Sequence, residues 1–229
     1  MEISKRTIDV LKNFHSINQS LYYNPDTNKK QLTTKSIQSN IIAGVDIDEE
    51  FPVEFAIFNL SEFLGALNLF DKPDLEFSEK YVIVRECGSR RGGLKYFFAN
   101  PHLIAYPKKP PVEPEANIKF YLSAEQLNKL TKAASSLSVN DLLVFGDDEG
   151  VHLIVKDKNN STSNDYEVTV SSESQGDFEH YFKVENWKFL PGNYNVGITI
   201  REGANGTQGL GFFTSEDGSV KYGVAVEKI

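Results

Sequence analysis

The sequence predicts an α+β fold made of two similar halves, each with antiparallel strands and two helices. Residues 108–115 contain three prolines and divide the 229-residue chain almost equally. Each half opens with apolar residues at helical spacing, and most of the remainder consists of short runs rich in β-branched and aromatic residues. Few helices among many short strands indicate antiparallel sheets in an α+β arrangement.

The opening helix of each half is amphipathic. In the first half the apolar stripe consists of Ile3, Thr7, Val10, Leu11, Phe14 and Ile17, and Ser4 is placed to cap its start. In the second half the stripe consists of Leu127, Leu130, Ala134 and Leu137. There Ser123, with Gln126 three residues later, has the spacing of a capping box.

A second, shorter helical segment is expected in each half. Residues 55–67 alternate like a strand and then become helical after Asn59, an Asx residue suited to capping. Their counterpart is residues 180–192, in which Lys188 is expected on a short helical segment that Pro191 and Gly192 end.

The remaining pattern predicts strands and turns. The expected strands are residues 41–47, 81–85, 142–145, 151–155, 166–171, 194–200 and 222–226. Glycine-bearing hairpin turns are expected at residues 146–150 and 202–206. The predicted domains are residues 1–107 and 117–229, joined by an extended connector at residues 108–116, where the prolines exclude helix and central strand.

The charge balance permits a nucleic-acid partner only if cations and anions are segregated. The net charge is -8 and the pI about 5.1, but binding depends on the local field rather than the sum. A single cysteine, Cys87, excludes an internal disulfide and fits a reducing cytoplasm. No signal peptide or membrane-spanning run is expected.

The lysines lie on the polar faces of corresponding helices, whereas the acids concentrate in turns and strand ends. The candidate cations are Lys5, Arg6, Lys12, Lys129, Lys132 and Lys188. Taken singly, each is also explained as a solvated residue that keeps an amphipathic helix soluble. Their recurrence on matching helices of both halves favours a cationic surface.

The residues give no positive support for catalysis, a metal or a cofactor. The acidic run formed by Asp46, Asp48, Glu49 and Glu50 lacks the glycine and terminal glutamate of an EF-hand and is interpreted as a solvated turn. The four histidines are scattered, and no phosphate-binding loop of the P-loop type is present. We therefore expect a protein that is not an enzyme.

Four ordered segments resemble the sliding clamp of T-even-like bacteriophages. They are residues 11–14 (LKNF) with Ile17 and Asn18, residues 55–67 (FAIFNLSEFLGAL), residues 124–127 (AEQL) with Leu130, and residues 187–194 (WKFLPGNY). The resemblance covers essentially the whole chain. Residues 24–31 and 85–93 depart from the family pattern, so no interactions are carried over there.

The resemblance implies a DNA clamp fold, in which three subunits close head to tail into a ring with helices inside and sheets outside. It also implies duplex DNA, the replicative DNA polymerase and an ATP-dependent clamp loader as partners, and late-transcription factors of the phage as further ones. The host cytoplasm would be its location. A polymerase tail is expected in an apolar pocket near Tyr106, Val112, Val224 and Val226, for which ordinary strand core is the alternative. Subunit contacts are expected at edge-strand residues Tyr166, Val168 and Val170.

Three other functions are consistent with parts of the pattern. A β-rich capsid or tail protein would assemble without DNA, and a hydrolase would need acids and bases in one cleft. A single-strand DNA-binding protein normally displays aromatics beside basic residues on strands. Here the aromatics occupy mostly apolar positions and the lysines lie on helices.

Overall fold

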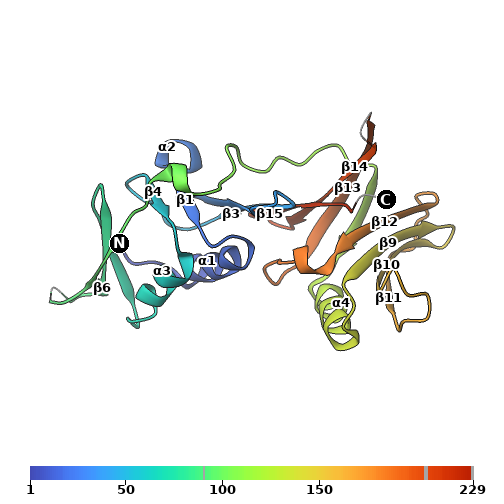
Figure 1. The fold of residues 1–229 in the computed structure, drawn as a ribbon, viewed down its shortest axis with the longest axis horizontal. Helices are drawn as coiled ribbons and strands as arrows, with labels where there is room; N and C mark the ends of the chain where they lie inside the picture. Colours follow the sequence, from blue (N-terminus) through green and yellow to red (C-terminus); the bar gives the residue numbers. More distant parts are fainter. Residues whose placement is uncertain (90, 204–205, 228–229) are drawn as a thin grey trace. The chain divides into compact units, whose positions relative to one another are not determined.

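The computed structural model describes residues 1–229 except residues 90, 204–205 and 228–229. The chain forms two compact units, Met1–Pro111 and Val112–Ile229. Their boundary falls inside the proline-rich segment at residues 108–116. Antiparallel strands and few helices make up both units (Figure 1).

Unit 1, which is Met1–Pro111, contains three α-helices, seven strands and one 3-10 turn in its described part. In chain order they are α1 (Lys5–Ile17), β1 (Leu21–Tyr23), α2 (Pro25–Asn28), β2 (Gln31–Lys35), β3 (Ile41–Asp46), β4 (Phe55–Ile57), α3 (Leu60–Leu67), β5 (Pro73–Phe77), β6 (Tyr81–Glu86), β7 (Leu94–Phe97) and η1 (Pro101–Leu103). Antiparallel pairing gives one sheet in the order β4-β1-β2-β3 and a second in the order β5-β6-β7.

Alternation along the strands of unit 1 divides its larger sheet into a core face and an outer face. Leu21, Tyr23 and Leu32 are at most 2 % exposed, and α1 packs on β2 and β3 on that side. Tyr22 and Thr33 are a cross-strand pair one residue out of phase, so they point to the opposite face. In Figure 1 α1 and α3 accordingly lie on one side of this sheet and α2 on the other.

Unit 2, which is Val112–Ile229, contains one α-helix, eight strands and one 3-10 turn in its described part. They are β8 (Ile118–Leu122), α4 (Ala124–Leu137), β9 (Asp141–Asp147), β10 (Gly150–Lys156), β11 (Tyr166–Ser171), β12 (Phe178–Lys183), η2 (Val184–Asn186), β13 (Tyr194–Gly203), β14 (Gly206–Ser215) and β15 (Val220–Ala225). The sheets run β12-β9-β10-β11 and β8-β13-β14-β15. The expected turn at residues 202–206 includes residues 204–205, which lie outside the described residues.

The two units share one strand topology. The order β4-β1-β2-β3 in unit 1 matches β12-β9-β10-β11 in unit 2. In each sheet the fourth strand of the chain segment lies at one edge, beside the first, and the second and third strands follow. In the second sheet, β5-β6-β7 matches β13-β14-β15, and the bridge between Glu2 and Asp74 occupies the place of β8. The internal repeat is therefore a repeat of connectivity as well as of sequence pattern.

Helix ends follow the predicted caps. Ser4 accepts the Thr7 backbone N–H at the start of α1, Asn59 caps α3, and Ser123 with Gln126 forms the full capping box on α4. Helix α2 was not predicted, although Asn24 followed by Pro25 is a usual helix start and indeed caps it.

The prediction of a second helical segment in unit 2 is wrong in its position and extent. Within residues 180–192 the only helical turn is η2, and Lys188 lies beyond it in an irregular segment. Because Pro191 and Gly192 follow within one turn, too few residues remain to close α-helical hydrogen bonds.

Candidate nucleic-acid interface

Helix α1 buries one face and exposes its cations on the other. Lys5, Arg6 and Lys12 are exposed, whereas Val10, Leu11 and Phe14 are at most 2 % exposed. Lys5 and Lys12 are two turns apart and therefore lie on the same side. Lys12 Nζ is 3.9 Å from Asp9 Oδ1, and Arg6 Nε donates to the Asp46 carbonyl at 3.3 Å. The described residues include no ion-pair partner for Lys5.

The start of α1 is fixed by Glu49, whose interpretation as part of a solvated turn is wrong. Glu49 is only 8 % exposed, while Asp48 and Glu50 on either side are exposed. Its carboxylate accepts short hydrogen bonds from the Ser4 backbone N–H and from the Thr7 hydroxyl. A buried anion at a helix N-terminus is stabilised by the helix dipole and by unpaired N–H groups. Glu49 thus sets the position of the helix that carries the cations.

Helix α4 presents the corresponding cations of unit 2. Lys129 and Lys132 are both exposed, while Leu127, Leu130 and Ala134 face the sheet. Lys129 Nζ lies 2.7 Å from Glu125 Oε1, and this hydrogen bond raises the pKa of Lys129 and lowers that of Glu125. In the described part of the chain Lys132 has no such partner. Lys5 and Lys132 are therefore the cations least neutralised by their own helix.

Lys188 differs from the other predicted cations. It is half-buried, lies outside any helix and is already engaged in a contact. Its neighbours Trp187 and Phe189 pack into the aromatic cluster around Phe213, with ring centroids 5.7 and 4.5 Å away. The position of this segment is therefore determined by the packing of Trp187 and Phe189 more than by the charge of Lys188.

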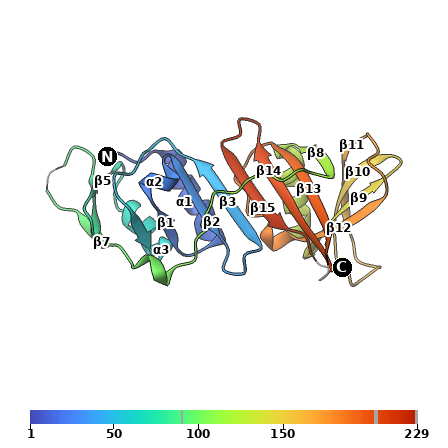
Figure 2. The same cartoon turned by 90° about the horizontal axis from the view of Figure 1, so that it is seen from above.

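Tyr106 lies in a groove of about 200 Å³ on the outer face of the unit 1 sheet. Its ring stacks on Tyr22 with centroids 4.0 Å apart, and Lys108 Nζ lies 4.0 Å from its centroid. Figure 2 shows the chain after η1 running over this sheet. The lining residues are Tyr22, Asn24, Thr27, Asn28, Thr33, Tyr106, Pro107, Lys108, Lys109 and Pro110. Tyr22 was missed because its partner is distant in sequence, although alternation with buried Leu21 and Tyr23 marks it as outward-facing.

The three valines predicted to share a pocket with Tyr106 have different environments in unit 2. Val112 is 80 % exposed, whereas Val224 is wholly buried in β15. Val226 is half-buried, and its N–H donates to the Gly209 carbonyl at 2.9 Å. Because Val224 offers no surface, the expectation that it lines a partner pocket is wrong, and the alternative of ordinary strand core describes it.

The predicted subunit-contact residues lie on an edge strand. Tyr166, Val168 and Val170 are half-buried in β11, which pairs with β10 on one side and ends its sheet on the other. The described residues give β11 no second ladder partner within its sheet. The Gln126 side chain donates to the Thr169 carbonyl at 3.2 Å and so satisfies one backbone group of this edge.

The described residues contain no cluster of His, Cys, Asp and Glu side chains suited to a metal ion. None of their helices has the length and apolar content needed to cross a bilayer.

The chain has sequence relatives with a known role. Residues 4–90 match the family described as DNA polymerase processivity factor. The chain is 32 % identical to the sliding clamp of Vibrio phage KVP40 over 86 % of its own length and 90 % of the relative's. It is 27 % identical to the sliding clamp of Enterobacteria phage T4 over 99 % and 97 % of the two chains.

A solved structure shares the fold without close sequence similarity. The chain aligns with A. fulgidus PCNA bound to the C-terminal region of FEN-1, with a TM-score of 0.65 and 15 % identity. The alignment covers 97 % of this chain and 94 % of that one. A clamp fold with antiparallel sheets and few helices is thereby established. These relatives give no support to the alternative of a capsid or tail protein.

Proposed function

Because the chain belongs to the sliding clamp family and so acts as a DNA polymerase processivity factor, we propose that its subunits close into a ring around duplex DNA. The 32 % identity to the KVP40 clamp over nearly its whole length carries this proposal. Linkage of the ring with the duplex, rather than affinity for it, would then retain the polymerase on its template.

Helices α1 and α4 are proposed to face the DNA. The repeated topology places each at the same point of its unit, and each exposes lysines on the side away from its sheet. Lys5 and Lys132 would contribute most, with Arg6, Lys12 and Lys129 weakened by their present contacts. Lys188 would contribute least, since it is half-buried and engaged.

Weak, sequence-independent contact is what sliding requires. Phosphates repeat along the duplex at every register, and lysine meets them as a hydrated point charge without the bidentate geometry of arginine. Acids in turns and loops, such as Asp148, Glu149 and Asp177, would repel DNA from the remaining surface.

Ring closure is proposed to join β11 of one subunit to β7 of the next. Each ends a sheet within its own unit, and an edge strand is a ready template for pairing with another chain. β11 carries Tyr166, Val168 and Val170, while β7 exposes Lys95 and Phe97, the latter 65 % exposed. Two different edges on one subunit give a head-to-tail contact that can close into a ring. The number three rests on the phage clamps that the chain resembles.

A partner tail is proposed to bind in the unit 1 groove beside Tyr106. The groove beside Tyr106 lies on the sheet face opposite α1, so a tail there would not compete with DNA on that helix. A clamp-fold relative bound to the C-terminal region of another protein provides a precedent for this mode. The replicative polymerase is the first partner proposed, and late-transcription factors of the phage are further ones.

An ATP-dependent clamp loader is proposed to open the ring, since the sequence has no P-loop with which the chain could use ATP itself. No catalytic activity or cofactor is assigned. The cytoplasm of the infected host, where replication takes place, is the proposed location.

Retention on circular DNA tests encirclement directly. The clamp would be loaded on nicked circular duplex and isolated by gel filtration, and the circle would then be cut once with a restriction enzyme. We expect the clamp to remain on the circle and to leave after cutting. Retention that is unaffected by cutting would refute encirclement, and a parallel sample with blocked DNA ends would show whether escape occurs by sliding off.

A further inference from the structure

A buried histidine joins the edge strand β11 to the β9–β10 turn. His152 lies on β10 and is only 6 % exposed. Its neighbours Val151 and Leu153 point to the core face, so the imidazole lies on the opposite face of the sheet. There it packs against Phe145, with ring centroids 6.0 Å apart.

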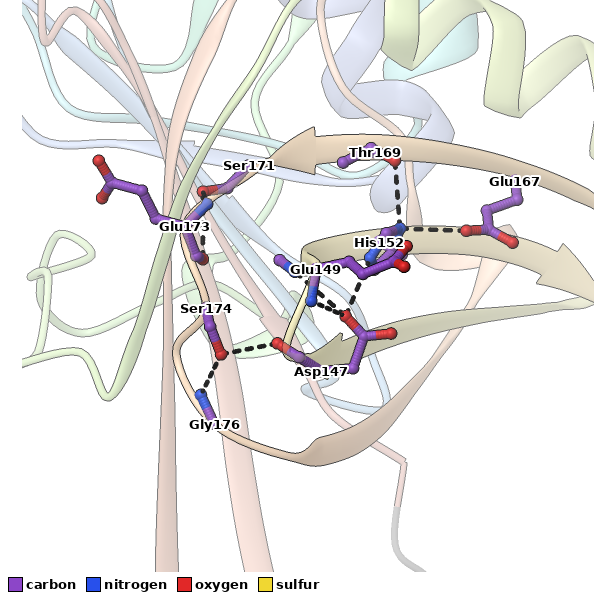
Figure 3. Close-up of polar contacts among 10 residues, drawn as sticks. Asp147, Glu149, His152, Glu167, Thr169, Ser171, Glu173, Ser174 and Gly176 are labelled. Carbon is purple, nitrogen blue, oxygen red and sulfur yellow. Dashed lines mark hydrogen bonds and ion pairs between the residues drawn. The ribbon is translucent and has the colours of Figure 1, made fainter.

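Each ring nitrogen of His152 faces a carboxylate from a different element (Figure 3). Nδ1 lies 3.0 Å from Glu167 Oε1 and 3.2 Å from Thr169 Oγ1, both on β11. Nε2 lies 3.4 Å from Asp147 Oδ1 and, although buried, has no hydrogen-bond partner of good geometry in the described structure. The ring therefore spans the gap between the turn and the edge strand.

The turn side of this arrangement is rigid. Asp147 Oδ1 accepts the backbone N–H groups of Glu149 and Gly150 at 2.7 and 3.1 Å, and Ser174 Oγ donates to the Asp147 carbonyl at 2.7 Å. Glu167, in contrast, has a side chain that is 53 % exposed. The contact with His152 therefore restricts the motion of Glu167 and β11 more than that of the turn.

His152 also stands at an irregularity of β11. The pairing shifts between Val151 and His152, from Ser171 opposite Val151 to Thr169 opposite His152. Val170 is consequently an extra residue that has no partner on β10, which is a β-bulge in the edge strand. A bulge interrupts the backbone hydrogen bonds between the two strands locally. Side-chain contacts beside it therefore contribute more to holding β11 in place.

The protonation state of the imidazole decides whether both contacts are favourable. The imidazolium carries an N–H on both nitrogens and is attracted to both carboxylates, whereas neutral imidazole directs one lone pair toward a carboxylate oxygen. The turn also carries Asp148 and Glu149, and Glu173 follows β11, while one cation, Lys156, lies four residues along β10 on the same face as His152. Glu179 on β12 lies opposite Phe145, against which the ring packs.

We propose that protonation of His152 fastens β11 to the β9–β10 turn and thereby strengthens the association between subunits. The step to subunit association rests on the proposed role of β11 in ring closure. Histidine changes charge near neutral pH. The subunits therefore associate more strongly on the acid side of this range and more weakly on the alkaline side. A strand that is already ordered loses less conformational entropy when it pairs with another chain.

The test measures the dissociation constant of the ring by sedimentation velocity between about pH 6 and about pH 8, where histidine titrates. For the wild-type chain we expect weakening on the order of tenfold, the effect of roughly one lost charge-assisted contact. His152→Gln keeps a polar side chain without the charge and should show constant, weak association. Glu167→Gln, at a half-exposed site that tolerates substitution, should lose most of the pH dependence. His102→Gln changes an exposed histidine of unit 1 and should behave as wild type.

Hydrogen exchange of the β11 amides, corrected for the intrinsic effect of pH, provides the second readout. We expect their protection to fall with rising pH in the wild type and to stay low in His152→Gln. The proposal is overturned if His152→Gln keeps the wild-type pH dependence, or if β11 responds to pH while the ring does not. A chain that is monomeric throughout this range, with β11 protection still dependent on His152, would instead refute the ring assembly proposed above.

Discussion

Glu49 holds Thr7 at the start of α1, with the Thr7 hydroxyl donating to a carboxylate that is 42 positions away in the chain. The same carboxylate accepts the Ser4 N–H, so one buried anion fixes the first turn of the helix that carries Lys5, Arg6 and Lys12. Glu49 therefore positions the proposed DNA-binding cations without contacting DNA itself in the proposed ring.

Replacing Glu49 should destabilise unit 1. Glu49→Gln removes the charge that the helix N-terminus stabilises, and Glu49→Ala also leaves the Thr7 hydroxyl without its acceptor. We expect a loss of about 1–3 kcal/mol for Glu49→Ala and a smaller loss for Glu49→Gln. Urea unfolding followed by far-UV circular dichroism measures both.

The matched control is Glu50→Gln, because Glu50 is adjacent in sequence but exposed. Its effect should lie within about 0.5 kcal/mol of zero, as for other surface substitutions. If Glu50→Gln cost as much as Glu49→Gln, the effect would come from net charge and not from the cap.

Removing Lys5 and Lys132 should weaken DNA contact more than removing other lysines. The double variant Lys5→Ala with Lys132→Ala takes away the two cations that their own helices leave unpaired. Each lost phosphate contact lowers the slope of log K against log salt by roughly 0.9. Binding of the ring to short duplexes, measured over a salt series, gives this slope directly.

Lys80→Ala is the control for that series, since Lys80 is exposed at the turn between β5 and β6. It changes the net charge without touching α1 or α4 and should leave the slope unchanged. An equal reduction in slope by Lys80→Ala would mean that DNA responds to the overall charge and that no specific face binds it.

The elements with local signals were predictable from sequence. Helix α1, helix α4 and the helix after Asn59 have apolar periodicity and caps within a few residues, and the structure confirms all three. The short helical segment expected around Lys188 does not form, because Pro191 leaves too few residues after Asn186 for an α-helix, and only the turn η2 remains.

The contacts that could not be predicted join residues distant in the chain. Burial of Glu49 depends on the return of residues 46–50 to the start of α1, and an acidic run in sequence has the composition of a solvated turn. The stacking of Tyr106 on Tyr22 likewise requires knowledge of where the chain after η1 crosses the sheet. Position in the chain alone predicts a pocket residue at Val224, whereas in the structure it pairs with Gly211 inside the sheet and is fully buried.

Two glycine substitutions should have opposite effects on stability. Gly150 has a φ of +137°, and a Cβ there would lie 2.0 Å from the Ser171 carbonyl oxygen, so Gly150→Ala must distort the β10–β11 pairing. Gly65 lies in α3, and no neighbouring atom comes within 4 Å of the place that an alanine methyl group would occupy. Gly65→Ala should therefore stabilise the helix by about 0.5–1 kcal/mol.

Thermal unfolding monitored by circular dichroism compares the two variants. We expect Gly150→Ala to cost on the order of 2 kcal/mol or more, as is usual for strain at a special backbone conformation. It should also weaken the ring, since β11 is the proposed contact strand. A ring of unchanged affinity in a destabilised Gly150→Ala chain would count against β11 as that strand.

His180 should make unit 2 sensitive to acid. Burial lowers the pKa of His180, whose ring stacks on Phe178 with centroids 5.8 Å apart. The unfolded chain therefore binds the proton more tightly than the folded chain. The stabilising contribution is complete above the unfolded pKa of about 6.5 and is lost as the pH falls through and below that value.

Trp187 is the single tryptophan of the chain and packs on Phe182 and Phe213 in unit 2, so its fluorescence reports the unfolding of this unit. The wild-type midpoint in urea should fall between about pH 7 and pH 5, across the range in which histidine titrates, and should fall less in His180→Gln. Equal acid sensitivity in the wild type and in His180→Gln would show that burial of this ring does not govern the pH response of unit 2.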